Sequence, residues 1–115
     1  MWWALLLLTQ AQVEERPRVT VALADGGTLS FVPVTAGDED YPPAAKRVDA
    51  EGVSDLELTI ETDGTVSACR VYATSGNPDL DRRSCELYRE RAAFRVSGRT
   101  RPVVVRAPVK WVLQE

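Results

Sequence analysis

The chain has 115 residues, of which 44% are hydrophobic and 27% charged, and these values fit one globular domain with a single core. It contains no histidine and only two cysteines, which excludes Cys-His and Ser-His catalytic pairs and leaves a zinc site short of ligands. The net charge of −3 combines 4 basic and 12 acidic side chains in residues 1–63 with 10 basic and 5 acidic ones in residues 64–115, and we expect these halves to neutralise each other partly after folding.

Residues 1–12 begin with a short apolar run from Trp2 to Leu8, followed by Thr9-Gln10-Ala11. The run is much shorter than the roughly 20 residues that a membrane helix needs. It fits the apolar part of a signal peptide, with small residues at the spacing of a cleavage site, although a basic start is missing. We predict export, and two alternatives stay open. Residues 2–8 could be a weakly membrane-associating stub or the tail of an anchor, or the start site could be placed too far downstream.

Residues 13–40 are predicted to form a β-hairpin followed by an acidic linker. The apolar and β-branched runs at 19–23 and 28–34 flank Asp25-Gly26-Gly27, which is the chemistry of a tight turn. Pro33 has no backbone N–H, so the second strand is expected to lie at an edge or to end there. Residues 35–40 are small and acidic without an apolar period, which predicts a linker.

A short helix and a second hairpin are predicted next. Proline at positions 42 and 43 suits the first turn of a helix, so we expect a helix from 42 to about 50, ended by Gly52, with one side formed by Ala44, Ala45 and Val48. Residues 53–61 alternate between polar side chains and Leu56, Leu58 and Ile60, which predicts a strand with one buried face. The Asp63-Gly64 turn leads to an antiparallel strand over 66–73, with a common face of Cys69, Val71 and Ala73.

The last third predicts a second helix and a third strand. Asp79 is the expected N-cap of a helix that runs to about residue 93 and carries a stripe of Leu80, Ser84, Leu87, Tyr88 and Arg91. After Ser97-Gly98, the β-rich run 102–113 predicts a final strand, in which Pro108 implies a bulge or an edge position. The predicted fold is α+β, a three-stranded antiparallel sheet with two helices packed on it in the order α-β-β-α-β, preceded by the hairpin.

The two cysteines, Cys69 and Cys85, fall in the second predicted strand of this sheet and in the second helix. A disulfide between them would join positions sixteen residues apart and stabilise the fold by about 3 kcal/mol in the entropic description. Disulfides persist in oxidising compartments, which agrees with export. Two separate buried thiols are the alternative, because free cysteine is commonly buried.

Six short motifs follow one another in a characteristic order: Tyr41-Pro42, Glu51-Gly52, Asp63-Gly64, Ser75-Gly76, Leu80-Asp81 and Phe94. Over residues 41–115 this order resembles the C-terminal domain of TonB, the periplasmic protein that passes inner-membrane energy to outer-membrane receptors. The cysteine pair is similar to that of a branch of this family with one cysteine in strand two and one in helix two. The family commonly has a proline after the final aromatic residue, and here Val96 follows Phe94-Arg95, so the exit from the helix is expected to differ.

The resemblance implies a periplasmic protein-binding module that binds an extended peptide of an outer-membrane receptor or another envelope protein by β-strand addition, and association with the inner membrane stays open. The predicted edge is 103–113, where apolar side chains would pack beside the added strand and basic ones would attract an acidic peptide. The candidate partner-binding residues are Arg101, Val103, Val105, Arg106, Val109, Lys110 and Trp111. The N-terminal hairpin could instead occupy this edge, and a homodimer also stays open.

Other functions are not expected from the sequence. It contains no phosphate-cradling glycine loop or helix-borne metal motif, so we predict no catalysis, cofactor or metal site. Seven arginines between 82 and 101 raise nucleic-acid binding as an alternative, but Glu86, Glu90 and the acidic pI favour a solvated helix face. An energy transducer of this family needs a membrane anchor and a long proline-rich spacer, which these 115 residues do not display. The alternative function is therefore an envelope structural or regulatory accessory protein without an energy-transducing role.

Overall fold

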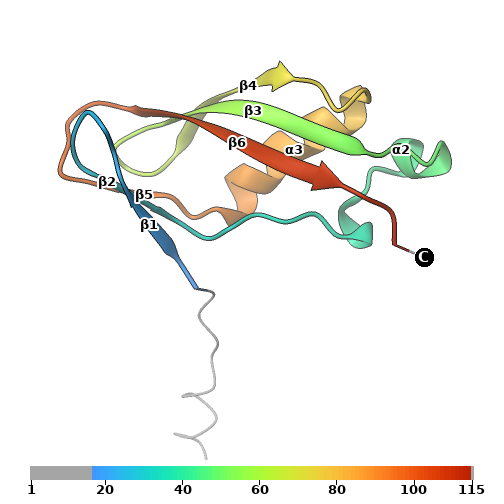
Figure 1. Ribbon diagram of the computed structural model, residues 1–115, viewed down its shortest axis with the longest axis horizontal. Helices are drawn as coiled ribbons and strands as arrows, with labels where there is room; N and C mark the ends of the chain where they lie inside the picture. The colour runs from blue at the N-terminus through green and yellow to red at the C-terminus, as the bar shows by residue number, and fades with distance from the viewer. Residues whose placement is uncertain (1–16, 115) are drawn as a thin grey trace, which may run out of the picture.

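The computed structural model describes residues 17–114, which form two three-stranded antiparallel sheets (Figure 1). The main sheet has the order β4-β3-β6, with β3 at Gly52–Ile60, β4 at Val66–Ala73 and β6 at Val103–Trp111. The hairpin sheet has the order β1-β2-β5, with β1 at Val19–Ala22, β2 at Thr28–Phe31 and β5 at Arg95–Ser97. The helices are a 3-10 turn, η1, at Asp38–Asp40, then α2 at Pro43–Arg47 and α3 at Pro78–Arg91.

This architecture confirms the predicted α+β class, the N-terminal hairpin and the order of the main elements. The sequence did not reveal β5, which pairs with β2 and turns the hairpin into a sheet of its own. The predicted signal peptide at 1–12 and the membrane-associating stretch at 2–8 lie outside the described residues.

The main sheet buries one face under α3 (Figure 1). Leu56, Leu58 and Ile60 are fully buried, whereas the polar residues between them remain partly accessible, as the alternation predicts. The helix begins after Asn77, whose Oδ1 accepts hydrogen bonds from the N–H groups of Asp79 and Leu80 at 2.9 and 3.2 Å. The predicted cap at Asp79 is therefore wrong by two residues, because Asn77 supplies the oxygen that satisfies the first N–H groups.

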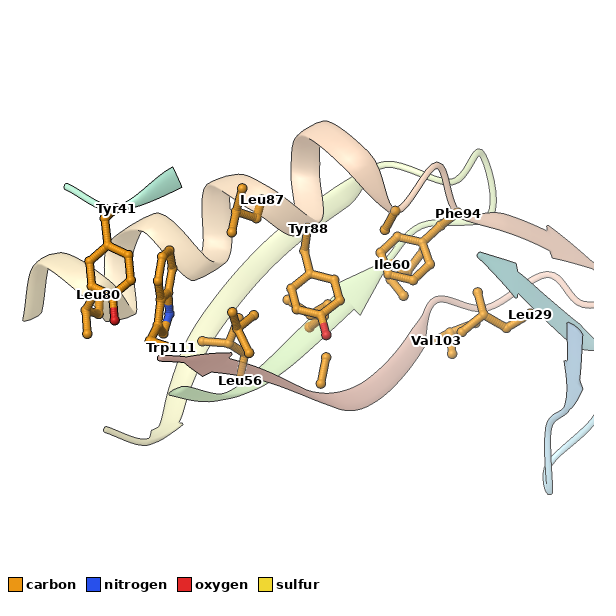
Figure 2. Close-up of a cluster of buried hydrophobic side chains, with 14 of the residues drawn as sticks. Leu29, Tyr41, Leu56, Ile60, Leu80, Leu87, Tyr88, Phe94, Val103 and Trp111 are labelled. Carbon is orange, nitrogen blue, oxygen red and sulfur yellow. The ribbon is translucent and has the colours of Figure 1, made fainter. Parts of the chain in front are cut away.

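The core runs along the main sheet and continues into the hairpin sheet (Figure 2). At one end, the indole of Trp111 lies edge-on against Tyr41 with ring centroids 5.0 Å apart. The indole N–H donates to Ser84 Oγ at 2.8 Å. At the other end, Leu29 of β2 and Val103 of β6 are both buried in the same cluster, so the hairpin sheet shares the core of the main sheet.

Two glycines of the sequence motifs allow close contacts between distant segments. A Cβ atom at Gly64, which has a φ of +90°, would come within 2.2 Å of the Phe94 carbonyl oxygen. A Cβ atom at Gly52 would lie 2.4 Å from the Ser75 carbonyl oxygen. Both positions therefore exclude a side chain, since such approaches are far inside van der Waals contact. The motif residues of this chain thus contact one another across the fold.

Two local predictions need correction. The first helix ends at Arg47, not near residue 50, because Asp49 adopts a left-handed φ of 52°. Its buried residue is Ala45, while Val48 remains 68% exposed and does not join the expected apolar side. In β4, register shifts occur near both ends of the pairing with β3. Cys69 and Val71 pair with the buried residues Leu58 and Leu56, whereas Ala73 pairs with Asp55. The predicted common face of Cys69, Val71 and Ala73 is therefore interrupted at Ala73.

The predicted acidic linker is partly an anchored element. Asp40 of η1 is only 4% exposed and accepts a hydrogen bond from the Gly37 N–H at 2.8 Å. Its carboxylate also receives both terminal nitrogens of Arg91, whose hydrogen bonds hold the pKa of Asp40 below its ordinary value despite burial. The acidic N-terminal half and the basic C-terminal half therefore pair directly. Asp25 does the same at the hairpin turn, where its carboxylate binds Arg99 and Arg101.

A buried polar network joins Ser54 of β3, the loop after β4 and Asp81 of α3. The Asp81 carboxylate accepts hydrogen bonds from Ser54 Oγ at 2.8 Å and from the N–H and Oγ of Ser75 at 2.9 and 2.8 Å, and a further bond comes from Thr74 Oγ1. Burial raises the pKa of Asp81, but these hydrogen bonds outweigh it and lower the pKa below its ordinary value. The Ser-Gly and Leu-Asp motifs thus belong to one network.

We expect acid to destabilise the fold below about pH 4, partly through Asp81. Since the pKa of Asp81 is lower in the folded protein, its contribution is fully present above the unfolded-state pKa and is lost as the pH falls through the folded-state pKa. Asp81→Asn should cost about 1–3 kcal/mol at neutral pH and flatten the acid loss. Urea unfolding from about pH 7 to about pH 3 measures both effects. The exposed Asp49→Asn serves as the control, and an unchanged acid loss in Asp81→Asn would contradict this role.

Candidate functional site

The two outer strands of the main sheet differ in regularity. The strand β6 pairs with β3 over nine consecutive residue pairs, from Gly52–Trp111 to Ile60–Val103, without a register shift. The strand β4 carries register shifts near both of its ends. Bulges are a common way to prevent an edge from accepting another strand, whereas a regular edge offers evenly spaced N–H and C=O groups. The edge of β6 is therefore the better template for an added strand.

Pro108 interrupts the outer side of β6. It has no N–H, and its carbonyl already accepts a hydrogen bond from Tyr88 Oη at 2.7 Å. Figure 2 shows the Tyr88 side chain pointing from α3 toward β6. Burial raises the pKa of Tyr88 to about 12, so the phenol keeps its proton and remains a donor at neutral pH. Pro108 thus lies on an outer strand, as the sequence predicted. It offers no backbone N–H to an added strand.

Beyond Pro108, the outer side of β6 continues toward the end of the chain. The strand ends at Trp111, but its alternation continues, because the Leu113 N–H turns back to the Glu51 carboxylate at 2.8 Å. The backbone groups of Lys110 and Val112 therefore lie on the same side as the Pro108 carbonyl. The next such residue, Gln114, donates its N–H to Asp38 Oδ1 at 3.2 Å. The outward side is therefore occupied at Pro108 and at Gln114. Between them, Lys110 and Val112 can offer two N–H and two C=O groups to an incoming chain.

A groove lies along this part of the edge, with the segment 34–36 as its opposite side. It has a volume of about 470 Å³, and its lining residues are Val34, Thr35, Ala36, Pro108, Lys110, Val112 and Gln114. Figure 1 shows the chain after β2 running alongside β6 toward η1. No backbone hydrogen bond within residues 17–114 joins this segment to β6. The groove is thus bounded by two extended stretches of chain that do not pair with each other.

The structure corrects the predicted role of three apolar site residues. Val103, Val109 and Trp111 point to the helix-covered face and are only 3%, 2% and 0% exposed. Their side chains belong to the core and cannot pack against an added peptide, because alternate residues of a strand face opposite sides of the sheet. Val105 is half-buried on the same side.

The three basic site residues are exposed, but they lie in different surroundings. Arg101 binds the carboxylate of Asp25 at 3.2 Å and holds the hairpin turn. The guanidinium of Arg106 lies 3.5 Å from the ring centroid of Tyr72, across the open face of the sheet. Lys110 lines the groove, and no ion pair within residues 17–114 includes it. Of the predicted residues, Lys110 is therefore the cation best placed to meet a ligand in the groove.

The N-terminal hairpin does not occupy the edge of β6. Its strand β2 pairs with β1 on one side and with β5 on the other. The hairpin turn lies against the loop before β6, where Arg99 and Arg101 bind Asp25, and beside the first residues of the strand. The alternative in which the hairpin strands mask this edge or extend the sheet is therefore wrong, and the segment after the hairpin approaches the edge instead.

Several residues that bound or line this part of the edge had no signal in the sequence. Tyr88 was predicted as part of a helical core stripe, and nothing indicated that its hydroxyl reaches a strand twenty positions away. The contributions of Asp38 and of residues 34–36 depend on how the segment after β2 folds back along β6. A stretch of small residues without periodicity does not reveal such a position.

Other kinds of site find no support in the described part of the chain. Within residues 17–114, no three acidic or cysteine side chains are grouped so that they could hold a metal ion. No helix in this range is long and apolar enough to cross a membrane. Five of the seven arginines between 82 and 101 form ion pairs with acidic side chains: Arg82, Arg83, Arg91, Arg99 and Arg101. Most of the basic cluster is thus used within the fold.

Comparison with known proteins gives one finding. Residues 38–113 match the family model of the Gram-negative bacterial TonB protein C-terminal domain. The match starts at η1, whose Asp40 is anchored to α3, and it ends just after β6. The searches of curated proteins and of solved structures returned no match. Because the family model covers most of the chain, the protein belongs to the TonB C-terminal family, whose domains are non-catalytic modules that bind outer-membrane TonB-dependent receptors.

Proposed function

We propose that this protein binds an extended segment of an outer-membrane receptor or another envelope protein by adding it as a strand to the outer edge of β6. The observation that carries the proposal is the uninterrupted pairing of β6 with β3 combined with the absence of a backbone partner on its outer side within residues 17–114. Main-chain hydrogen bonds to such an edge supply affinity, and neighbouring side chains supply selectivity. Coupling to energy-dependent transport would follow the receptor contact.

The proposed compartment is the periplasm, and the disulfide supports it. Cys69 and Cys85 are bonded to each other, with their Cα atoms 6.0 Å apart. Disulfides form and persist in oxidising compartments such as the bacterial periplasm, and they are rare where thiols are kept reduced. The structure thereby settles the sequence alternative between a disulfide and two free thiols in favour of the disulfide.

The proposal predicts that removing outward N–H groups of β6 weakens the binding of an extended peptide. A suitable probe is a synthetic heptapeptide of alternating valine and serine with a central glutamate, titrated into the ¹⁵N-labelled protein and followed by NMR. The double variant Arg106→Pro/Lys110→Pro lacks two outward donors while the alternate residues keep their bonds to β3. We expect binding to weaken about fivefold for each outward hydrogen bond that the peptide makes at these two positions, at about 1 kcal/mol per bond.

The matched control is Arg106→Gln/Lys110→Gln, which removes the same two charges and keeps both N–H groups. It should bind more tightly than the proline variant. A peptide with N-methylated amides at alternate positions should fail to bind the wild type, because it cannot complete the ladder. If the wild type binds both peptides alike, or both double variants bind the probe as the wild type does, strand addition is wrong and the accessory function is favoured.

A further inference from the structure

We infer that the segment 34–36 is the second wall of the peptide site, and that it confines strand addition to the two residues Lys110 and Val112. This inference rests on the proposed strand addition and specifies where it occurs. The ligand would be a short extended segment seated between β6 and residues 34–36, with an acidic side chain beside Lys110 and an apolar side chain against Val34, Ala36 and Val112.

The wall is tied to the domain along its length. The Val32 N–H donates to the Ala92 carbonyl at 2.8 Å, just after the end of α3. Arg91 donates to the Thr35 carbonyl at 3.4 Å and also binds the Asp40 carboxylate. One arginine therefore holds both the middle of the wall and the 3-10 turn that follows it. A segment fixed in this way defines the width of the groove in the absence of a ligand.

The length of the available edge follows from the two occupied positions. Tyr88 takes the Pro108 carbonyl, and Asp38 takes the Gln114 N–H. Towards the start of β6, a separate hollow is lined by Val103 and Val104 together with the hairpin turn and Arg99, so the hairpin sheet stands close to that part of the strand. An entering chain therefore meets free backbone groups between Pro108 and Gln114, beside a groove whose opposite wall is already formed.

The chemistry of the lining indicates the kind of segment that fits. Four of the seven lining residues are apolar: Val34, Ala36, Pro108 and Val112. Lys110 is the single charged residue among them, and its side chain is exposed. An acidic side chain next to an apolar one complements this surface, because opposite charges favour association and apolar burial supplies affinity.

The test compares single variants of the full chain with the same heptapeptide. Lys110→Pro should weaken binding about tenfold, whereas Arg106→Pro, outside the groove, should change it less than about twofold. Thr35→Trp places a bulky side chain on an exposed position of the wall and should weaken binding about tenfold by filling the groove. Val48→Trp, on an exposed position outside the groove lining, should bind as the wild type does.

The outcomes separate this inference from the proposed function. If Arg106→Pro weakens binding as much as Lys110→Pro while Thr35→Trp has no effect, the peptide pairs along the whole of β6 and the second wall is wrong, although strand addition stands. If none of the single variants nor the double proline variant affects binding, both proposals fail. Ala36→Leu is a smaller change in the same wall and should weaken binding less than Thr35→Trp does. If either of these two variants binds the peptide more tightly than the wild type, the inference is wrong.

Discussion

Trp111→Ala is expected to lower the free energy of unfolding by about 3–5 kcal/mol, the largest effect of any single substitution considered for this protein. Trp111 is fully buried, packs edge-on against Tyr41 and donates its indole N–H to Ser84. Alanine would leave a large cavity between β6, α3 and the motif Tyr41-Pro42. In a domain of this size, such a loss corresponds to a fall in melting temperature of at least roughly 12 °C.

Thermal and urea unfolding measure this effect, with Val104→Ala as a control on the same strand. Val104 is 60% exposed on the opposite face, so its truncation should change stability by less than about 0.5 kcal/mol. Trp111→Phe should fall between the two, because it keeps an aromatic ring but loses the N–H donor. If Trp111→Ala unfolds at the wild-type temperature yet loses peptide binding, Trp111 acts as a partner-binding residue as the sequence first suggested.

Removing the disulfide is the second large effect expected. Cys69→Ala/Cys85→Ala should lower the free energy of unfolding by about 3 kcal/mol, because the unfolded chain regains the freedom that the cross-link removes. The bond joins β4 to α3, so it fixes the outer strand that has an irregular pairing with β3. Urea unfolding with and without a reducing agent measures the contribution.

A reducing agent should destabilise the wild type by a similar amount and leave the double alanine variant unchanged. That comparison separates the cross-link from the packing of the two side chains, both of which are half-buried beside the core. An alanine variant that is within about 0.5 kcal/mol of the oxidised wild type would show that the disulfide contributes little to stability.

The motifs that carry the family resemblance are mainly structural. Gly64 lies against the Phe94 carbonyl, Gly52 against the Ser75 carbonyl, and Asp81 accepts from Ser75. Tyr41 donates its hydroxyl to the Ala50 carbonyl at 2.9 Å, and the Glu51 carboxylate accepts from the Leu113 N–H at 2.8 Å. These residues hold the helices and strands to one another. They therefore maintain the fold, and they do not by themselves distinguish one partner from another.

The sequence by itself determined the features that depend on local chemistry. The alternation of Leu56, Leu58 and Ile60 predicted the central strand, and the Asp63-Gly64 turn predicted the hairpin that follows it. Pro108 indicated an edge position, which the order β4-β3-β6 confirms. Such patterns repeat along the chain with the period of the backbone, so neighbouring residues are enough to recognise them.

The tertiary structure alone decided which side of the edge strand is available and what stands opposite it. Alternation in β6 places Val103, Val109 and Trp111 on one face, but only the position of α3 shows that this face is the core and not the partner-binding face that the sequence suggested. The pairing of Tyr88 with Pro108, and the position of residues 34–36 beside Lys110, join segments far apart in the sequence. Their contacts follow from long-range packing, for which a single sequence carries no periodic signal.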